Sequence, residues 1–165
     1  MPSPYIQDYY PDDLAWCYGC GRYNEKGHHF QTAWDGEETV TRFTPESHHM
    51  AIPGCVYGGL LASLIDCHST GSAALAAYRA QGHEPGDTAP VPRFVTAALH
   101  VNYLKPTPMG VTLEAHGRIK EIKERKVVVE TTIYADGDAC VTGEAVLVKM
   151  PLHMIPTDLP LSPES

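Results

Sequence analysis

The sequence predicts an α+β fold in which an antiparallel sheet wraps around one long central helix. The helix is indicated by an apolar segment from Tyr57 to about Tyr78, in which Asp66 is the only side chain certain to be charged at neutral pH. The sheet is indicated by four strand-like segments after the helix and two shorter ones before it. Such a sheet can bury one helix against its face, while its edge strands stay open, so we expect dimerisation by edge-to-edge pairing.

The segments before the helix begin with residues 1–27, where Pro, Asp, Tyr and Gly recur and predict an irregular N-terminal segment. Two short strands are expected at 28–34 and 38–43, joined by a hairpin turn at Asp35-Gly36. Residues 44–56 contain two prolines and Gly54, which indicates a loop that leads into the helix.

The helix is apolar on nearly every side, so we expect it to be buried on most of its surface. Gly82 is a natural stop, and a polar loop should run from there to Pro92. The second half of the chain is predicted to form strands separated by turns. The segment 111–122 alternates apolar and polar residues, as a half-buried strand does. The four strands are expected at 94–104, 111–122, 127–135 and 140–150, with Asp136-Gly137-Asp138 as the last turn. We therefore assign one domain to 28–150 and a disordered, Pro-rich tail to 151–165.

Composition narrows the classes of function. The chain has 165 residues, a formal charge of −8 and a pI near 5.5, without a long basic stripe, which argues against nucleic-acid binding. The five cysteines are odd in number and no secretory leader is recognised at the N-terminus, so we expect a reducing, cytoplasmic setting. Polar residues within 57–78 argue against a membrane span.

The pattern Gly58-Gly59 followed by Asp66 indicates a candidate catalytic site. A carboxylate on an apolar helix is costly to bury unless it is paired, hydrogen-bonded or protonated. The glycines lie where the helix begins, and free backbone N–H groups and the helix dipole attract negative charge there. Together they suit attack on a carbonyl group. The alternatives are a structural, hydrogen-bonded Asp66 and glycines that serve close packing.

Three stretches resemble one family. They are Cys17-Tyr18-Gly19-Cys20-Gly21, then Gly54-Cys55-Val56-Tyr57-Gly58-Gly59 with Asp66 beyond, and finally the strand from Val95 to Tyr103-Leu104-Lys105-Pro106. In this order they resemble the hotdog-fold acyl-coenzyme A thioesterases, in the branch of the phenylacetate-pathway enzymes and the thioesterase-superfamily members. The likeness spans roughly residues 17 to 150.

The resemblance implies a mechanism. Gly59 would donate its N–H to the thioester carbonyl, Asp66 would act as nucleophile or as general base, and Thr96 would help to position the attacking water. In this branch the groups of one site come from different subunits, which implies a homodimer or a dimer of dimers. No cofactor is implied, because coenzyme A is part of the substrate.

Candidate substrate-binding residues also follow from the likeness. One departure stands out, because the family has His where this chain has Tyr57, and it motivates a second hypothesis of a non-catalytic acyl-coenzyme A-binding module. A dehydratase is a third hypothesis, although its usual pairing of His with an acid is not evident. For Lys105, a contact with a coenzyme A phosphate and a solvated position in a loop are equally compatible with the sequence. For Thr96, the alternative to a role in the site is an inward strand position filled by packing. The substrate-binding candidates are Tyr57, Gly58, His49, Asn102, Tyr103 and Lys105.

The cysteines raise the question of a metal. Cys17 and Cys20 have the spacing of a zinc-binding pair, and His28 and His29 follow. A second pair is missing, and neighbouring histidines on a strand would point to opposite faces. We therefore predict no metal site and expect the cysteines to pack as small apolar side chains.

Overall fold

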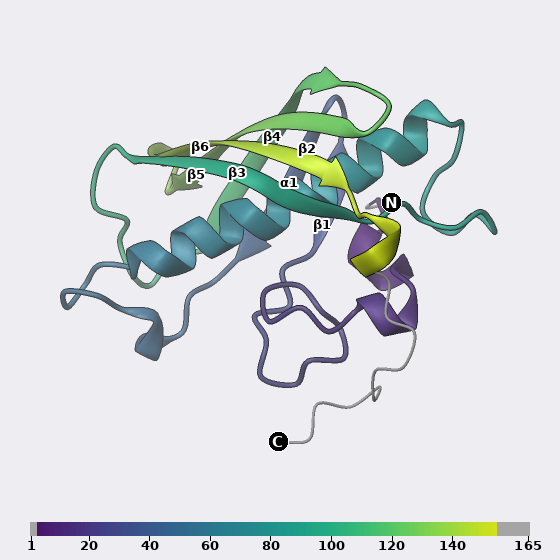
Figure 1. Ribbon diagram of the computed structural model, residues 1–165. Coiled ribbons are helices and arrows are strands. Elements are labelled where there is room, and N and C mark those ends of the chain that lie inside the picture. The colour runs from purple at the N-terminus through teal and green to yellow at the C-terminus, as the bar shows by residue number, and fades with distance from the viewer. Residues whose placement is uncertain (1–2, 155–165) are drawn as a thin grey trace.

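In the part of the chain that the structure describes, six strands form one antiparallel sheet that curves around a single long helix (Figure 1). The computed structural model describes residues 3–154. The strands lie in the order β1-β2-β4-β5-β6-β3, so β1 and β3 form the two edges of the sheet. The predicted fold class, an antiparallel sheet wrapped around one central helix, is confirmed.

The elements follow the predicted order, two strands, one helix and four strands. Both predicted hairpins occur, since Gly36 has a φ of 64° and Asp136 and Gly137 have φ values of 50° and 81°, as tight hairpin turns require. Among residues 3–154, four short 3₁₀ helices add to these elements, at Ile6–Tyr9, Asp12–Leu14, Ser47–His49 and Leu152–Met154. The strands and the helix are β1 (Thr32–Asp35), β2 (Glu38–Phe43), α1 (Gly58–Ala80), β3 (Phe94–Tyr103), β4 (Leu113–Ile122), β5 (Lys126–Ala135) and β6 (Asp138–Lys149).

The start of the first strand differs from the prediction. We expected a strand from His28, but β1 begins at Thr32. His29 has a φ of 57°, which breaks an extended backbone. The N–H groups of His28 and Phe30 donate to carbonyl oxygens of the N-terminal segment, at Tyr18 (3.0 Å) and Gly19 (2.9 Å). Residues 28–31 therefore pair with a loop instead of with the sheet.

Helix α1 is the centre of the core. Leu64, Ile65 and Leu75 are at most 1% exposed, and most other positions of the helix are buried as well. The helix ends where predicted, because Gly82 takes a φ of 84° just beyond it. Within residues 3–154, no helix combines the length and the apolarity that a membrane crossing demands.

The N-terminal segment packs into the same core. Ile6 and Tyr10 are buried against the helix side of the domain. Gln7 bonds twice to β1, since its Nε2 donates to Thr32 Oγ1 (3.0 Å) and its Oε1 accepts from Thr32 N (2.7 Å). The predicted Pro-rich tail falls largely on residues 155–165, which lie outside the described residues.

A buried polar network ties β2 to α1 around His68. The ring Nδ1 lies 2.7 Å from Thr41 Oγ1, and Nε2 lies 3.2 Å from Thr39 Oγ1. Thr39 Oγ1 also lies 2.6 Å from Ser72 Oγ. Full burial, with a smaller effect of His116, lowers the pKa of His68 to about 3, so the ring is neutral. Gly117 on β4 leaves the room for this ring, because a Cβ there would collide with Nε2.

Candidate functional site

Asp66 is held by the edge strand β3. Thr96 Oγ1 donates a hydrogen bond of 2.5 Å to Asp66 Oδ1, and both residues are half-buried. Thr96 lies next to a bulge in β3, between Thr96 and Ala98, where the pairing with β6 shifts register. The fold thus brings together two of the three predicted catalytic residues, and the second oxygen of the carboxylate is left for another partner.

The start of α1 brings together a second group of predicted residues. Tyr103 Oη, from the end of β3, donates to the carbonyl oxygen of Gly58 at 2.7 Å. The exposed ring of Tyr57 lies over Gly59, since a Cβ at Gly59 would be 2.6 Å from ring carbons. Gly59 stands in the first turn, where the backbone N–H has no partner within the helix. The site therefore offers a free N–H beside a phenol.

One stripe along α1 joins the two groups. Gly59, Ala62, Ser63 and Asp66 recur at helical spacing, and all four are half-exposed on a helix that is otherwise mostly buried. Seven residues at a rise of about 1.5 Å each put Gly59 and Asp66 about 10 Å apart along the helix axis. The two predicted catalytic groups of one chain share a face but are too far apart to contact one carbonyl.

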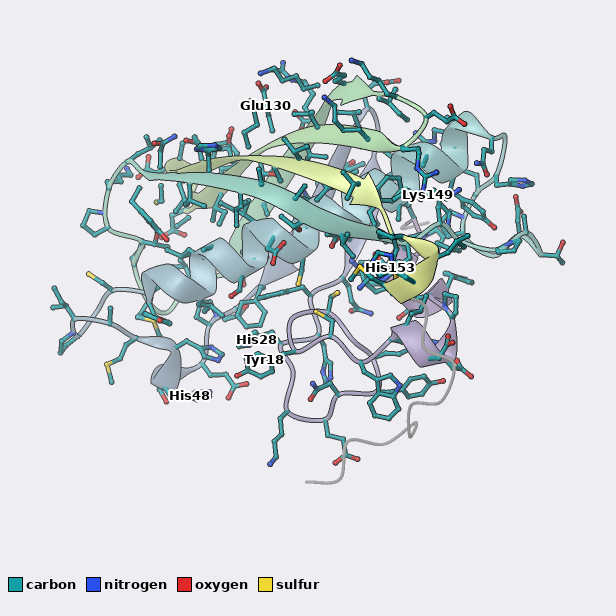
Figure 2. All side chains as sticks on the ribbon, viewed as in Figure 1. Tyr18, His28, His48, Glu130, Lys149 and His153 are labelled. Atoms are coloured by element: carbon teal, nitrogen blue, oxygen red, sulfur yellow. The ribbon has the colours of Figure 1, made fainter. Side chains whose placement is uncertain are left out.

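His49 lies in the loop before α1 and has local partners. Its Nδ1 accepts from Glu46 N (2.9 Å), which closes the short helix Ser47–His49, and its carbonyl oxygen accepts from Tyr57 N (2.9 Å). Its ring packs against His28 at 5.2 Å between centroids, and His28 packs on Tyr18 (Figure 2). Burial, and then the nearby His48, lower the pKa of His49. The side chain is engaged in the loop and has no contact with Asp66.

Asn102 and Lys105 lie apart from the two groups. Neighbouring strand residues point to opposite faces, and Tyr103 points to the helix, so Asn102 faces the outer side of the sheet. Lys105 Nζ lies 3.2 Å from Asp138 Oδ2, at the β5–β6 turn. The structure thus gathers Asp66 with Thr96, and Tyr57, Gly58 and Gly59 with Tyr103, but not Asn102, Lys105 or the ring of His49.

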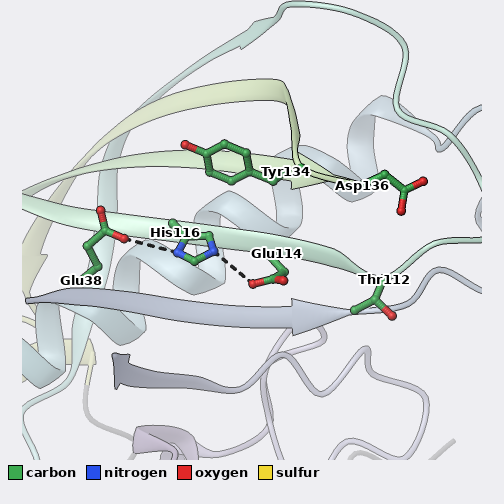
Figure 3. Close-up of a pocket in the computed structure, with 7 residues that line it drawn as sticks. Glu38, Thr112, Glu114, His116, Tyr134 and Asp136 are labelled. Atoms are coloured by element: carbon green, nitrogen blue, oxygen red, sulfur yellow. Dashed lines mark hydrogen bonds and ion pairs between the residues drawn. The ribbon is translucent and has the colours of Figure 1, made fainter. Parts of the chain in front are cut away.

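A hollow in the surface of the sheet lies elsewhere. It has a volume of about 470 Å³ and sits on the face of the sheet opposite α1 (Figure 3). His116 lies in it between two carboxylates, with Nδ1 3.3 Å from Glu38 and Nε2 3.1 Å from Glu114. We do not assign the site to this hollow, because the sheet separates it from Asp66 and from the start of α1.

Comparison with known proteins identifies the family of this chain. A family model described as the Thioesterase superfamily matches residues 53–142. A solved Thioesterase superfamily protein from Shewanella loihica PV-4 is 49% identical, over 85% of this chain and 98% of that one, with a TM-score of 0.65. The chain belongs to the Thioesterase superfamily.

Two further proteins resemble the chain. Acyl-coenzyme A thioesterase THEM4 of Mus musculus is 28% identical over 109 residues, which are 66% of this chain. The chain spans 41% of the length of that relative. The E. coli PaaI protein from the phenylacetic acid degradation operon shares the fold, with 17% identity over 76% of this chain and 83% of that one and a TM-score of 0.61. The predicted hotdog fold is confirmed.

The Thioesterase superfamily match covers Asp66 and Thr96 but neither Cys17 nor Cys20, and no motif in the sequence predicted a third partner for these two cysteines. Cys67, the residue after Asp66, meets Cys17 and Cys20 beneath the helix, and the three sulfurs lie within 4.8 Å of one another. The only cue was that Cys67 stands on a helix predicted to be buried, because the meeting depends on how residues 15–30 fold back.

Proposed function

We propose that this chain hydrolyses acyl-coenzyme A thioesters, with Asp66 as nucleophile or general base and Gly59 as the oxyanion donor. The observation that carries the proposal is the half-exposed stripe of α1, on which a carboxylate and a free helix-start N–H share one face. Membership of the Thioesterase superfamily supports thioester hydrolysis, and the likeness to the THEM4 thioesterase supports coenzyme A esters as the substrate class.

The proposal requires two copies of the chain. The separation of about 10 Å between Gly59 and Asp66 along α1 is too large for one carbonyl to contact both groups. In a two-fold dimer with antiparallel helices side by side, Gly59 of one copy would lie opposite the Asp66 of the other, which produces two equivalent sites.

The edge of the sheet supports this pairing. Strand β3 is ten residues long and pairs only with β6 among the strands described, so its other edge is free. A long free edge is a template for pairing with a second chain. Because Thr96 of β3 bonds to Asp66, an edge-to-edge dimer would place a second copy directly beside the stripe.

The chemistry follows from the roles of these groups. As general base, Asp66 would take a proton from water through its second oxygen while the water oxygen attacks the thioester carbon. The carbonyl oxygen becomes an oxyanion that accepts the N–H of Gly59, and a fixed donor of this kind is worth about 2.7–4 kcal/mol of barrier. Collapse of this intermediate breaks the C–S bond and releases the coenzyme A thiolate and the free acid.

Substrate contacts are part of the same proposal. Several exposed apolar side chains surround the start of α1, where an acyl chain and a second copy would cover them. Lys105 retains an exposed amine near the end of β3, which suits a phosphate group of coenzyme A. The exposed apolar side chains are Met50, Ile52, Tyr57, Tyr103 and Leu104.

A non-catalytic acyl-coenzyme A-binding module is the second candidate. The specific observation is the ring of Tyr57, which lies over Gly59 where the family has a histidine. If this phenol keeps a carbonyl away from the Gly59 N–H, the chain would bind the ester without cleaving it. Tight binding without thiol release over a broad panel of esters would favour this candidate.

The decisive experiment is a thiol-release screen over short, medium, long and aromatic acyl-coenzyme A esters. We expect turnover of at least one class by the unmodified chain and loss of most of it in Asp66→Asn, with the same circular dichroism spectrum. Glu114→Gln on the outer face serves as the control and should keep the rate. An Asp66→Asn protein that hydrolyses a good substrate at the parent rate would overturn the mechanism.

A further inference from the structure

Three cysteine thiols converge between the N-terminal segment and the central helix. The sulfurs of Cys17, Cys20 and Cys67 all lie within 4.8 Å of one another, and Cys17 Sγ lies 3.9 Å from Cys67 Sγ. Cys20 and Cys67 are buried, whereas Cys17 is half-buried. We propose that these three sulfurs bind a Zn²⁺ ion, which fixes the N-terminal segment to α1.

The spacing of the sulfurs suits a metal better than a disulfide. Zinc–thiolate bonds of about 2.3 Å in a tetrahedron place neighbouring sulfurs about 3.8 Å apart. The observed 3.9 Å between Cys17 and Cys67 is close to that edge. A disulfide would need about 2.05 Å between two sulfurs and would leave the third thiol without a partner.

The loop that carries Cys17 and Cys20 has the local structure of a zinc-binding turn. The two cysteines are separated by two residues, as in structural zinc sites. Gly19 N donates to Cys17 Sγ at 3.4 Å, and Gly21 N donates to the carbonyl oxygen of Cys17 at 2.7 Å. A Cβ at Gly19 would collide with Cys67 Sγ, so only glycine lets the loop approach the helix this closely.

The electrostatic surroundings suit three thiolates with one divalent ion. That set carries one net negative charge, which is costly to bury without a partner. The guanidinium of Arg93 lies 4.4 Å from the centre of the Tyr10 ring. Burial alone would lower the pKa of Arg93, but Tyr10 and the three cysteines lie near enough to raise it. Arg93 thus supplies the balancing positive charge.

Ligand number narrows the identity of the ion. Iron–sulfur clusters use four cysteines, whereas three thiols converge in the part of the chain described. The half-buried Cys17 leaves the fourth position of a zinc tetrahedron for a solvent molecule. Tyr10 Oη is a buried donor whose pKa is raised by burial and, to a smaller extent, by the nearby Cys20, Cys67 and Cys17, and it has no hydrogen-bond partner among residues 3–154. Such an unpaired group marks a place where an additional ligand can bond.

The site also explains why the sequence did not reveal it. One cysteine pair without a second pair led us to predict no metal, and the fold supplies the third ligand from α1. Because Cys67 follows Asp66 directly, the ion would hold the N-terminal segment against the turn of helix that carries the candidate catalytic carboxylate. The inference does not depend on the proposed function, because it concerns only the thiols and their surroundings.

The test measures metal in tag-free protein purified in reducing buffer without chelator. We expect about one zinc per chain by elemental analysis, and, after exchange with Co²⁺, the thiolate-to-cobalt charge-transfer band and the intense visible bands of a tetrahedral site. A chelator should lower the melting temperature. Zinc-free protein that takes up neither Zn²⁺ nor Co²⁺ would overturn the proposal, as would uptake of Cu⁺ alone.

Variants assign the ligands. Cys17→Ser is the first choice, because Cys17 is half-buried and its replacement should leave the fold intact; its zinc content should fall by about tenfold or more. Cys55→Ser is the matched control, since Cys55 is also half-buried but lies outside the cluster, and it should keep the zinc. Equal zinc in both variants would contradict the assignment, and the cobalt spectrum of the unmodified protein keeps the test valid if Cys17→Ser fails to fold.

Discussion

Thr96 and Asp66 join the edge of the sheet to the central helix through one hydrogen bond of 2.5 Å. Asp66 would otherwise be a half-buried carboxylate on a helix of apolar and small residues. The bond occupies Oδ1 and restricts the rotation of the carboxylate, and Oδ2 is left for another partner. We therefore regard Thr96 as the residue that positions Asp66, in addition to any contact of its own with water.

Removing this hydroxyl should impair catalysis more than folding. Thr96→Val keeps the shape of the side chain but leaves Asp66 Oδ1 without its donor, and a misplaced catalytic group can cost about 100-fold in rate, so we expect kcat to fall by about 10- to 100-fold. Thr96→Ser retains the hydroxyl and should stay within a few-fold of the parent. Thiol-release kinetics and thermal melts of both variants separate the two effects. Equal rates for Val and Ser would show that Thr96 only fills space.

Buried His68 predicts a loss of stability in acid. Its pKa is lowered to about 3 in the folded chain, from an ordinary value of 6.5, so its stabilising effect is complete above pH 6.5 and is lost as the pH falls towards 3. In that window the unfolded chain binds the additional proton, and the loss is on the order of 3–5 kcal/mol.

Unfolding by urea at pH values between 7 and 4 measures this effect, with a chelator present so that bound metal does not contribute. His68→Gln is the control, because it cannot titrate, yet it still offers hydrogen bonds to Thr39 and Thr41. The variant should start less stable at pH 7 and lose less stability on acidification. The same pH slope in both proteins would mean that other groups cause the loss.

Much of the fold was predictable because local sequence and tertiary structure agree. The apolar segment that begins at Gly58 is helical in both, and alternation along 113–122 marks the face that packs on α1. The start of β1 was not predictable, since His28 and Phe30 bond to Tyr18 and Gly19 in an irregular loop and not to a strand. No sequence pattern within residues 28–31 predicts these bonds.

The candidate site was also predictable from the sequence only in part. Asp66 and Gly59 were found because a lone carboxylate and a glycine at a helix start are unusual in sequence. The sequence could have shown that Asn102 and Tyr103 lie on opposite faces of the sheet, because neighbouring strand residues point to opposite faces. The contact between Cys67 and Cys17 could not be predicted, because it depends on the path of the N-terminal segment.

Tyr103 and Asn102 form a matched pair for testing which face of β3 serves the substrate. Tyr103→Phe removes the hydrogen bond to Gly58 O, worth about 0.5–1.5 kcal/mol, and should loosen the start of α1, with kcat/KM lower by about 2- to 10-fold. Asn102→Ala on the outer face should leave kcat/KM unchanged. Steady-state kinetics of both variants on one substrate measure these effects. A larger loss of kcat/KM in Asn102→Ala than in Tyr103→Phe would place the substrate on the other face.

Mixing two inactive variants tests whether one site is built from two copies. Gly59→Pro deletes the N–H of the first helical turn, where proline is tolerated, and the exposed ring of Tyr57 has room to move aside. Asp66→Asn deletes the carboxylate. In a mixed dimer one site carries both defects and the other carries neither, so equimolar mixing after partial unfolding should restore about a quarter of the parent activity. Separate proteins mixed without exchange of copies should stay inactive. If exchange is verified by mass spectrometry and activity still does not return, Gly59 and Asp66 act within a single copy or not at all.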